Sequence, residues 1–255
     1  MLNALLARIQ QKHRTMRFPD GPPPQLSDRF AGRPVIRHPE NCQAGCRRCV
    51  DVCPVDAIEQ ADHRLRLDLG QCIFCTKCAA ACDRQGIRFS DDYRMSTRGR
   101  NDLAIEDADT FHLAAAQDHQ ALRLFGHSLK LRQVSAGGCN ACEVDINVLG
   151  TVGWDMGRFG IQFVASPRHA DGLVVTGPVT ENMRQALLKT YTATPDPKVV
   201  IAVGACAISG GIYKGHPESH DGIGELLPVD LYIPGCPPHP LTILDGLLRL
   251  MGRIK

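Results

Sequence analysis

Cysteine is the residue type whose number and spacing point to chemistry in this chain. There are 12 cysteines among 255 residues, and eight of them form two runs of four. The runs are Cys42, Cys46, Cys49 and Cys53, then Cys72, Cys75, Cys78 and Cys82. Thiolates at this spacing hold 4Fe-4S clusters, and the fourth cysteine of each run binds the cluster of the other run. The sequence therefore predicts two neighbouring clusters that relay electrons.

This crossing gives each cluster one ligand from the other run. Cluster one takes Cys42, Cys46, Cys49 and Cys82, and cluster two takes Cys53, Cys72, Cys75 and Cys78. Structural zinc is the alternative, because paired cysteines two residues apart also bind zinc. Zinc sites have a longer insert between two pairs, whereas each run here spans about a dozen residues and is repeated. We therefore favour iron-sulfur clusters.

Two positions depart from the usual pattern of such runs. Three residues separate Cys42 from Cys46 where two are usual, and Asp83 stands where proline normally follows the second run. Gly45 would ease the turn of the wider first loop. The insertion leaves the occupancy of cluster one open.

The remaining four cysteines are dispersed along the second half of the chain. They are Cys139, Cys142, Cys206 and Cys236. Loops after predicted strands carry them, and glycine and proline lie close by, so we expect one more 4Fe-4S cluster here. Unligated buried thiols are the alternative, but these normally lie within regular elements. All 12 cysteines are then assigned to three clusters of four ligands each.

A repeat positions the first eight cysteines. Cys46, Cys49 and Cys53 recur 29 positions later as Cys75, Cys78 and Cys82, which predicts two copies of a metal loop, a helical turn and a strand. Between the copies, residues 63–68 alternate between apolar and charged side chains, apart from His63, as a strand does. We expect an α+β, ferredoxin-like two-cluster domain over residues 33–95.

The second half of the chain has a different pattern of predicted strands and helices. Strand-like runs at 129–134, 161–165, 172–176, 198–203 and 230–233 alternate with helical stretches at 142–149, 181–191 and 240–254. The alternation predicts an α/β domain over residues 129–255, with a doubly wound, flavodoxin-like parallel sheet. Functional loops of such sheets lie beyond the carboxyl ends of the strands, where the last four cysteines fall.

Two further segments complete the chain. Over residues 1–32, Leu2, Leu5, Leu6 and Ile9 predict a short amphipathic helix that precedes a proline-rich strap. The helix either packs on its own domain or docks on a partner or a membrane surface. Residues 96–128 are expected to connect the domains, with a helix over 111–125.

Composition limits the classes of function. With 29 basic and 27 acidic residues and only 5% aromatic residues, the chain has neither the positive field nor the stacking surfaces that favour nucleic acid. The longest apolar run, 199–208, is about half of the roughly 20 residues that a membrane span needs, and the first residues lack the pattern of a secretory signal. We expect a soluble, cytoplasmic chain that does not bind nucleic acid.

Four motifs carry a family resemblance. They are residues 166–171 (SPRHAD), 176–180 (TGPVT), 204–206 (GAC) and 234–238 (PGCPP). Residues 125–255 resemble the small subunit of nickel-iron hydrogenases and its relative in complex I, the 20 kDa subunit that holds the terminal cluster. Two residues separate Cys139 from Cys142, which is similar to the membrane-bound group 4 hydrogenases of the formate hydrogenlyase type, whereas the complex I relative typically has adjacent cysteines. Residues 15–90 resemble the two-cluster ferredoxin-like subunit of the same complexes, so two subunits look joined.

The resemblance implies an electron relay inside a larger oxidoreductase. Electrons would pass through the ferredoxin-like clusters to a proximal cluster at the last four cysteines, and on to a nickel-iron centre in a separate large subunit. It also implies membrane subunits, a redox donor such as a ferredoxin or a formate dehydrogenase module, and a peripheral place on the inner face of the cell membrane. Catalysis would belong to the complex.

Glu143 is the candidate for a role beyond cluster binding. It follows Cys142 and opens a predicted helix, where a negative charge favours the positive helix end. The resemblance instead implies a proton relay at the large-subunit interface, and both interpretations stay open. His216 and His220 have the spacing of a metal-binding helix, but Pro217 breaks that geometry and predicts a surface loop.

Two other functions remain open at this point. One is the equivalent subunit of a complex I-like, quinone-reducing assembly, or of a hydrogenase-related complex without nickel. The other is a free-standing ferredoxin-like electron carrier.

Overall fold

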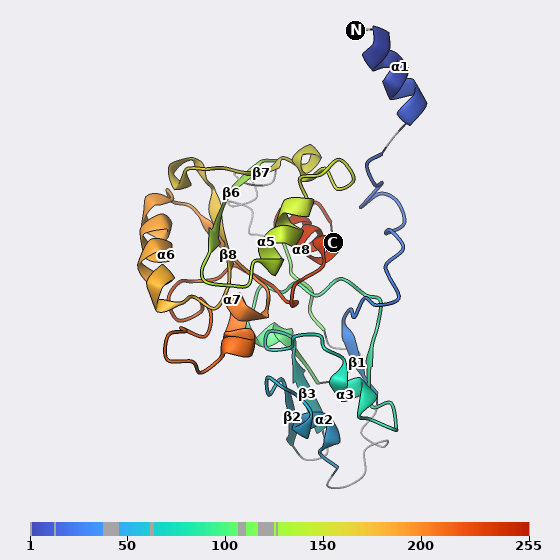
Figure 1. Ribbon diagram of the computed structural model, residues 1–255. Helices are drawn as coiled ribbons and strands as arrows, with labels where there is room; N and C mark the ends of the chain where they lie inside the picture. Colours follow the sequence, from blue (N-terminus) through green and yellow to red (C-terminus); the bar gives the residue numbers. More distant parts are fainter. Residues whose placement is uncertain are drawn as a thin grey trace.

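The computed structural model describes residues 2–12, 14–37, 46–61, 64–106, 111–116, 125 and 127–254. Cys42, Gly45 and His63 lie outside the described residues. The chain forms two lobes in contact, and an N-terminal helix projects away from both of them (Figure 1).

Two copies of one unit build the first lobe, as the repeat predicts. The first copy contains α2 (Arg48–Asp51) and β2 (Ile58–Ala61), and the second contains α3 (Lys77–Ala80) and β4 (Ile87–Phe89). β1 (Pro34–Ile36) pairs with β4, and β3 (Arg64–Asp68) pairs with β2, both antiparallel. The helical turns and strands of the two copies start 29 positions apart, at 48 and 77 and at 58 and 87. The predicted α+β ferredoxin-like lobe is confirmed.

The connecting segment takes part in both lobes. A short helix, η2 (Asn101–Leu103), leads into β5 (Ala104–Ile105), which pairs antiparallel with β3 of the first lobe. Thr97 forms a bridge with Tyr232 of the second lobe. The helix predicted over 111–125 is wrong at its start, because 111–116 have no regular structure and the Ala114 amide donates to the Ser96 carbonyl at 2.7 Å. Tertiary packing has displaced the local helix there, and residues 117–124 lie outside the described residues.

Five parallel strands form the sheet of the second lobe. They are β6 (Leu129–Ser135), β7 (Ile161–Phe163), β8 (Gly172–Thr176), β9 (Val199–Val203) and β10 (Leu231–Ile233). Their order is β7-β6-β8-β9-β10, and every neighbouring pair is parallel. Counted within this sheet the order is 2-1-3-4-5, which flavodoxin-like sheets also have. The predicted α/β domain with a parallel sheet is confirmed.

Helices cover both faces of this sheet. On one face lie α6 (Glu181–Ala193) and α7 (Ala205–Ser209), and on the other α5 (Ala141–Val148) and α8 (Pro240–Leu250) (Figure 1). Successive residues of β8 serve the two faces: Val175 packs in the core that contains Leu187 of α6, and Val174 in the core that contains Ile146 of α5. Strands buried on both faces are continuous apolar runs, as observed here.

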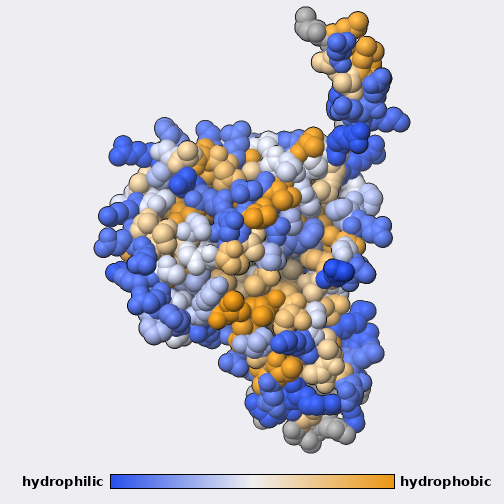
Figure 2. All heavy atoms as spheres, viewed as in Figure 1, coloured by the Kyte–Doolittle hydropathy of each residue, from blue (hydrophilic) through white to orange (hydrophobic). Residues whose placement is uncertain are grey.

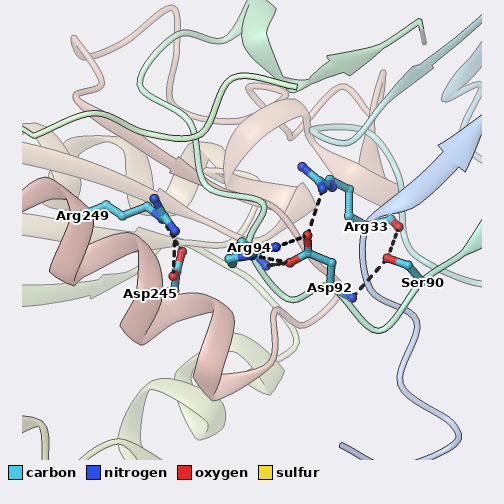
Figure 3. Close-up of polar contacts among 6 residues, drawn as sticks. All are labelled: Arg33, Ser90, Asp92, Arg94, Asp245 and Arg249. Atoms are coloured by element: carbon cyan, nitrogen blue, oxygen red, sulfur yellow. Dashed lines mark hydrogen bonds and ion pairs between the residues drawn. The ribbon is translucent and has the colours of Figure 1, made fainter. Parts of the chain in front are cut away.

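Charged groups of the two lobes act on one another near Asp245 of α8. Asp92, just after β4, accepts hydrogen bonds from Arg33 at 2.9 Å and from Arg94 at 2.8 Å (Figure 3). On α8, Arg249 donates to Asp245 at 2.7 Å, and these side chains are only 4% and 1% exposed. Burial raises the pKa of Asp245, while the charges of Arg249 and Arg94 oppose the rise. Removing one partner would leave a buried charge unpaired.

The N-terminal helix α1 (Leu2–Gln11) has the predicted amphipathic pattern, and its apolar side chains are exposed. The strap after it is fixed to the second lobe: the Met16 amide donates to the Gly153 carbonyl, and Arg158 donates to the carbonyls of Met16 and Phe18. None of the helices in the described part of the chain combines the length and the hydrophobicity needed to cross a membrane.

Candidate metal centres

The four dispersed cysteines meet at the carboxyl edge of the parallel sheet. Cys139 follows β6, Cys142 lies in the first turn of α5, Cys206 lies in α7 after β9, and Cys236 follows β10. Burial raises the pKa of the Cys142 thiol, and the charges of Glu143 and of the other three cysteines raise it further. Their electrostatic interaction shows that the fold brings the four sulfurs into one neighbourhood.

Glycines give these sulfurs room. A Cβ atom added at Gly204 would lie 2.6 Å from the Cys142 sulfur, and one at Gly211 would lie 2.9 Å from the Cys206 sulfur. Both glycines have positive φ angles, of 89° and 56°, which side chains rarely adopt. Burial raises the pKa of the Cys206 thiol to about 11, and the charges of Cys236 and Cys139 contribute. Four soft thiol donors and glycines that leave room beside their sulfurs fit an iron-sulfur cube.

A second set of four cysteines lines one pocket in the first lobe. Its members are Cys53, Cys72, Cys75 and Cys78, and apolar side chains surround them. Burial raises the pKa of Cys72 to about 12 and of Cys78 to about 11, and neighbouring cysteines contribute to both shifts. Backbone amides of Ala57 and Phe74 each donate to a sulfur at 3.3 Å, to Cys53 and Cys72 respectively. The fold thus brings Cys53 of the first run to the second run.

Three of the cysteines assigned to cluster one can be placed. Cys49 is buried, and Cys46 and Cys82 are partly exposed. The Gly86 amide donates to the Cys82 sulfur at 3.2 Å. Hydrogen bonds from Arg48 lower the pKa of Cys46. The fourth residue assigned to this cluster, Cys42, is outside the described residues.

The spacing of these groups differs from that of a single-ion site. Among the residues that the structure describes, no three His, Cys, Asp or Glu side chains are arranged to hold one metal ion. A cube spreads its four thiolate ligands over four iron atoms, so its ligands lie further apart than those of one ion.

The pocket of the first lobe and the cysteines of the second lobe are linked by direct contacts. Ser209, on the same short helix as Cys206, donates to the Gly70 carbonyl at 2.8 Å, two residues before Cys72. The Gly70 amide in turn donates to Asp68 at 2.8 Å, and Arg100 pairs with that carboxylate at 2.6 Å. Ser209, Gly70 and Arg100 carry no motif that marks them in the sequence, because each acts through a partner that is distant along the chain.

Glu143 directly follows Cys142 of the four-cysteine site in the second lobe. Its side chain is 5% exposed and accepts hydrogen bonds from Ser135 at 2.5 Å and from Thr176 at 2.6 Å. Ser135 and Thr176 are the last residues of β6 and β8. The carboxylate therefore has partners within the lobe as well as a place in the first turn of α5.

The two histidines that are four residues apart lie in a surface loop. His216 is exposed, and the His220 ring pairs with Glu181 at 2.6 Å. The predicted surface loop is confirmed, since neither residue lies in a helix.

Comparisons with known proteins match both cysteine-bearing regions. Residues 139–250 match the family of the NADH ubiquinone oxidoreductase 20 kDa subunit, and residues 34–83 match the 4Fe-4S dicluster domain. A probable membrane-bound hydrogenase subunit of Pyrococcus furiosus is 40% identical over 135 residues, which are 53% of this chain and 81% of that protein. The chain belongs to the 20 kDa subunit family.

Other relatives of this 20 kDa subunit family member come from related complexes. Formate hydrogenlyase subunit 7 of Escherichia coli is 41% identical over 141 residues, 55% of each protein. An NADH-quinone oxidoreductase subunit of Citrifermentans bemidjiense is 45% identical over 117 residues, 46% of this chain and 68% of the relative. The relatives are subunits of membrane-bound hydrogenase and complex I-like assemblies, and the chain has an iron-sulfur domain besides. It is an electron-transfer subunit of this type.

Proposed function

We propose that this family member relays electrons through three 4Fe-4S clusters to or from the nickel-iron site of a separate large subunit in a membrane-associated hydrogenase. The observation that carries the proposal is the contact between Ser209 and Gly70, which joins the Cys206 helix to the loop that enters Cys72. Electron transfer needs centres held close together, and this contact links two of the three ligand sets.

The ligand sets are those that the spacing predicts. Cys42, Cys46, Cys49 and Cys82 hold cluster one; Cys53, Cys72, Cys75 and Cys78 hold cluster two; Cys139, Cys142, Cys206 and Cys236 hold the proximal cluster. Each cluster, when bound, accepts or gives up one electron. The chain's own residues provide the thiolates, exclude water around Cys72 and Cys78, and donate backbone amides to the sulfurs.

The large subunit docks over the proximal cluster in this proposal. Cys139 and Cys236 are exposed thiols, and the nearby Val144, Ile212 and Tyr213 are 51%, 57% and 39% exposed. Hydrophobic residues gather over the region of α7 in Figure 2. Exposed apolar side chains grouped around a redox site mark a protein interface. Glu143, next to Cys142, is the proposed proton relay at that interface.

The wider assembly and the domain division are also part of the proposal. Membrane subunits hold the complex on the inner face of the cell membrane, and a ferredoxin or a formate dehydrogenase module supplies electrons at cluster one. Residues 1–32 form the helix and strap, 33–95 the two-cluster domain, 96–128 the connection, and 129–255 the doubly wound, flavodoxin-like domain. Within the connection, β5 pairs with β3 of the two-cluster domain.

A complex I-like, quinone-reducing or nickel-free assembly is the second candidate, favoured by the 45% identity to an NADH-quinone oxidoreductase subunit. The two-residue separation of Cys139 and Cys142 favours the hydrogenase. Four nickel-ligating cysteines in the large subunit that co-purifies with this chain would decide for the hydrogenase, and their absence for the second candidate.

Anaerobic purification of the native complex tests the function. We expect a bound large subunit, hydrogen evolution with a reduced donor, and about 12 iron atoms per copy of this chain. A stable monomer that carries electrons without any partner would contradict the proposal.

A further inference from the structure

The two copies of the repeat differ in charge at several equivalent positions, and one of these directly follows the last cysteine of each run. Arg48 in the first copy corresponds to Lys77 in the second, so both copies have a basic residue directly before the third cysteine of the run. Pro54 follows the first run, and Asp83 follows the second run at the equivalent position. A carboxylate therefore directly follows Cys82, beside cluster one, whereas an uncharged proline directly follows Cys53, beside cluster two.

The structure shows what this carboxylate contacts. Arg48, at the start of α2, donates to Asp83 at 2.5 Å, across the 35 positions between the two copies. The Arg48 charge also lowers the pKa of the neighbouring Cys46 thiol. One guanidinium group thus connects a ligand of the first run with the residue that follows Cys82, a ligand of the second run. α2 and α3 lie near the lower end of the molecule in Figure 1, where Figure 2 shows hydrophilic and hydrophobic residues side by side.

The pair contributes little to stability. The Arg48 and Asp83 side chains are 50% and 72% exposed, and exposed ion pairs are weak because solvent screens them. Its position relative to the sulfur matters more. Hydrogen bonds to ligand sulfurs and the net charge around a cluster set the reduction potential.

The sign of each effect follows from charge. Reduction adds one electron to the cluster, so a positive group next to a ligand sulfur stabilises the reduced state and raises the potential. A nearby carboxylate stabilises the oxidised state and lowers it. Beside cluster two, the position equivalent to Asp83 is the uncharged Pro54, so this second effect belongs to cluster one.

We propose that Arg48 and Asp83 form a tuning pair that sets the reduction potential of cluster one separately from that of cluster two. The pair positions one positive and one negative charge at the rim of cluster one. The step it adjusts is the transfer of one electron from the donor, which is oxidised, to cluster one, which is reduced, with no bond made or broken and no proton moved. The inference rests on the proposed function, because it requires cluster one to bind at Cys46 and Cys82.

Redox titration of the purified complex, followed by electron paramagnetic resonance, tests the pair. Arg48→Gln should lower the potential of cluster one, so that the ratio of reduced to oxidised cluster at a fixed potential falls roughly two- to fivefold, the range for an exposed charge pair. Asp83→Asn keeps a side-chain acceptor for Arg48 and should shift the ratio upward by a similar factor. Arg48→Lys keeps the charge and should restore most of the ratio.

Lys77→Gln is the matched control. It removes the equivalent charge from the second copy and should leave cluster one unshifted. Unchanged potentials of cluster one in both Arg48→Gln and Asp83→Asn, with about 12 iron atoms still bound, would overturn the tuning pair alone. About eight iron atoms in the unaltered chain would overturn both the three-cluster function and the tuning pair. If Arg48→Gln loses cluster one, Asp83→Asn decides: an upward shift of the potential of cluster one supports the tuning pair, and no shift or a downward shift overturns it.

Discussion

At the level of single residues, the backbone around each sulfur matters as much to the sites as the spacing of the cysteines. Amides of Ala57, Phe74 and Gly86 donate to sulfurs in the first lobe. In the second lobe, Gly204 and Gly211 leave the space that the Cys142 and Cys206 sulfurs occupy. These positions leave room around the sulfurs for the clusters that we propose.

Gly204→Ala should remove the proximal cluster. The new methyl group would lie 2.6 Å from the Cys142 sulfur, at a φ of 89° that alanine adopts poorly. We expect anaerobic protein to lose about four of about 12 iron atoms, with the resonance signals of the first lobe retained. Gly224→Ala is the control, since an added Cβ there meets nothing within 4 Å. Full iron content in Gly204→Ala would contradict this account.

The buried thiols predict a pH dependence of the metal-free chain. Burial raises the pKa of Cys72 to about 12 and of Cys78 to about 11, above the ordinary value of 9.0. The folded state therefore holds protons that the unfolded state loses above pH 9, so stability is full below that pH and falls as pH rises toward 11. The loss is at most about 1.4 kcal/mol per pH unit for each thiol.

Denaturant unfolding of the metal-free chain at pH 8 and pH 10 measures this loss. Replacing Cys72 or Cys78 with serine should reduce the difference between the two pH values. Equal stability of the unaltered chain at pH 8 and pH 10 would contradict the prediction that these thiols lower its stability at high pH.

At the level of helices and strands, α7 has two tasks. It presents Cys206 at the carboxyl end of β9, and through Ser209 it holds the loop before Cys72. The Asp68–Arg100 pair supports the same loop from the other side. Each lobe thereby fixes the position of a cysteine-bearing segment of the other.

Ser209→Ala should loosen this junction. The serine is 8% exposed, so its loss leaves the Gly70 carbonyl without its partner and should lower the free energy of unfolding by about 1–3 kcal/mol. Hydrogen exchange should accelerate in residues 68–72 and 205–209. Ser27→Ala, which removes only local hydrogen bonds at an exposed site, is the matched control. Unchanged exchange in both segments would argue against the junction.

The crossing of cysteines between the two copies also depends on how these elements pack. Cys53 belongs by sequence to the first run but lines the pocket of Cys72, Cys75 and Cys78. Cys53→Ser should therefore perturb the signal and the potential of cluster two and leave cluster one intact. A change confined to cluster one in the resonance spectra would reverse the assignment.

Across the molecule as a whole, the chain presents two different ends. The carboxyl edge of the parallel sheet carries exposed thiols with apolar neighbours, and the end of the first lobe around α2 and α3 carries the exposed Arg48–Asp83 pair. This polarity matches a subunit that receives electrons at one end and contacts its large subunit at the other.

Ile212→Glu should weaken binding of the large subunit. Ile212 is 57% exposed next to the Cys206 site, so a charge there opposes burial in an interface without creating a cavity in the chain. We expect loss of co-purifying large subunit with unchanged iron content of this chain. Val152→Glu is the control: this side chain is 71% exposed, but it lies after α5 beside the strap, where Thr15 donates to its carbonyl, and the variant should retain the partner. Equal retention by both variants would place the interface elsewhere.

The three cysteine groups, the repeat and the alternation of strands and helices can be read from the sequence alone, because spacing and periodicity are local properties of the chain. Other features depend on distant partners and emerge only in the folded chain: the pairing of Arg48 with Asp83, the strand that 104–105 adds to the first sheet, and the loss of helix at 111–116. Ser209 and Gly70 are 139 positions apart, and neither residue carries a local signal of the other. Their contact exists because two separately encoded lobes pack their cysteine-bearing loops together.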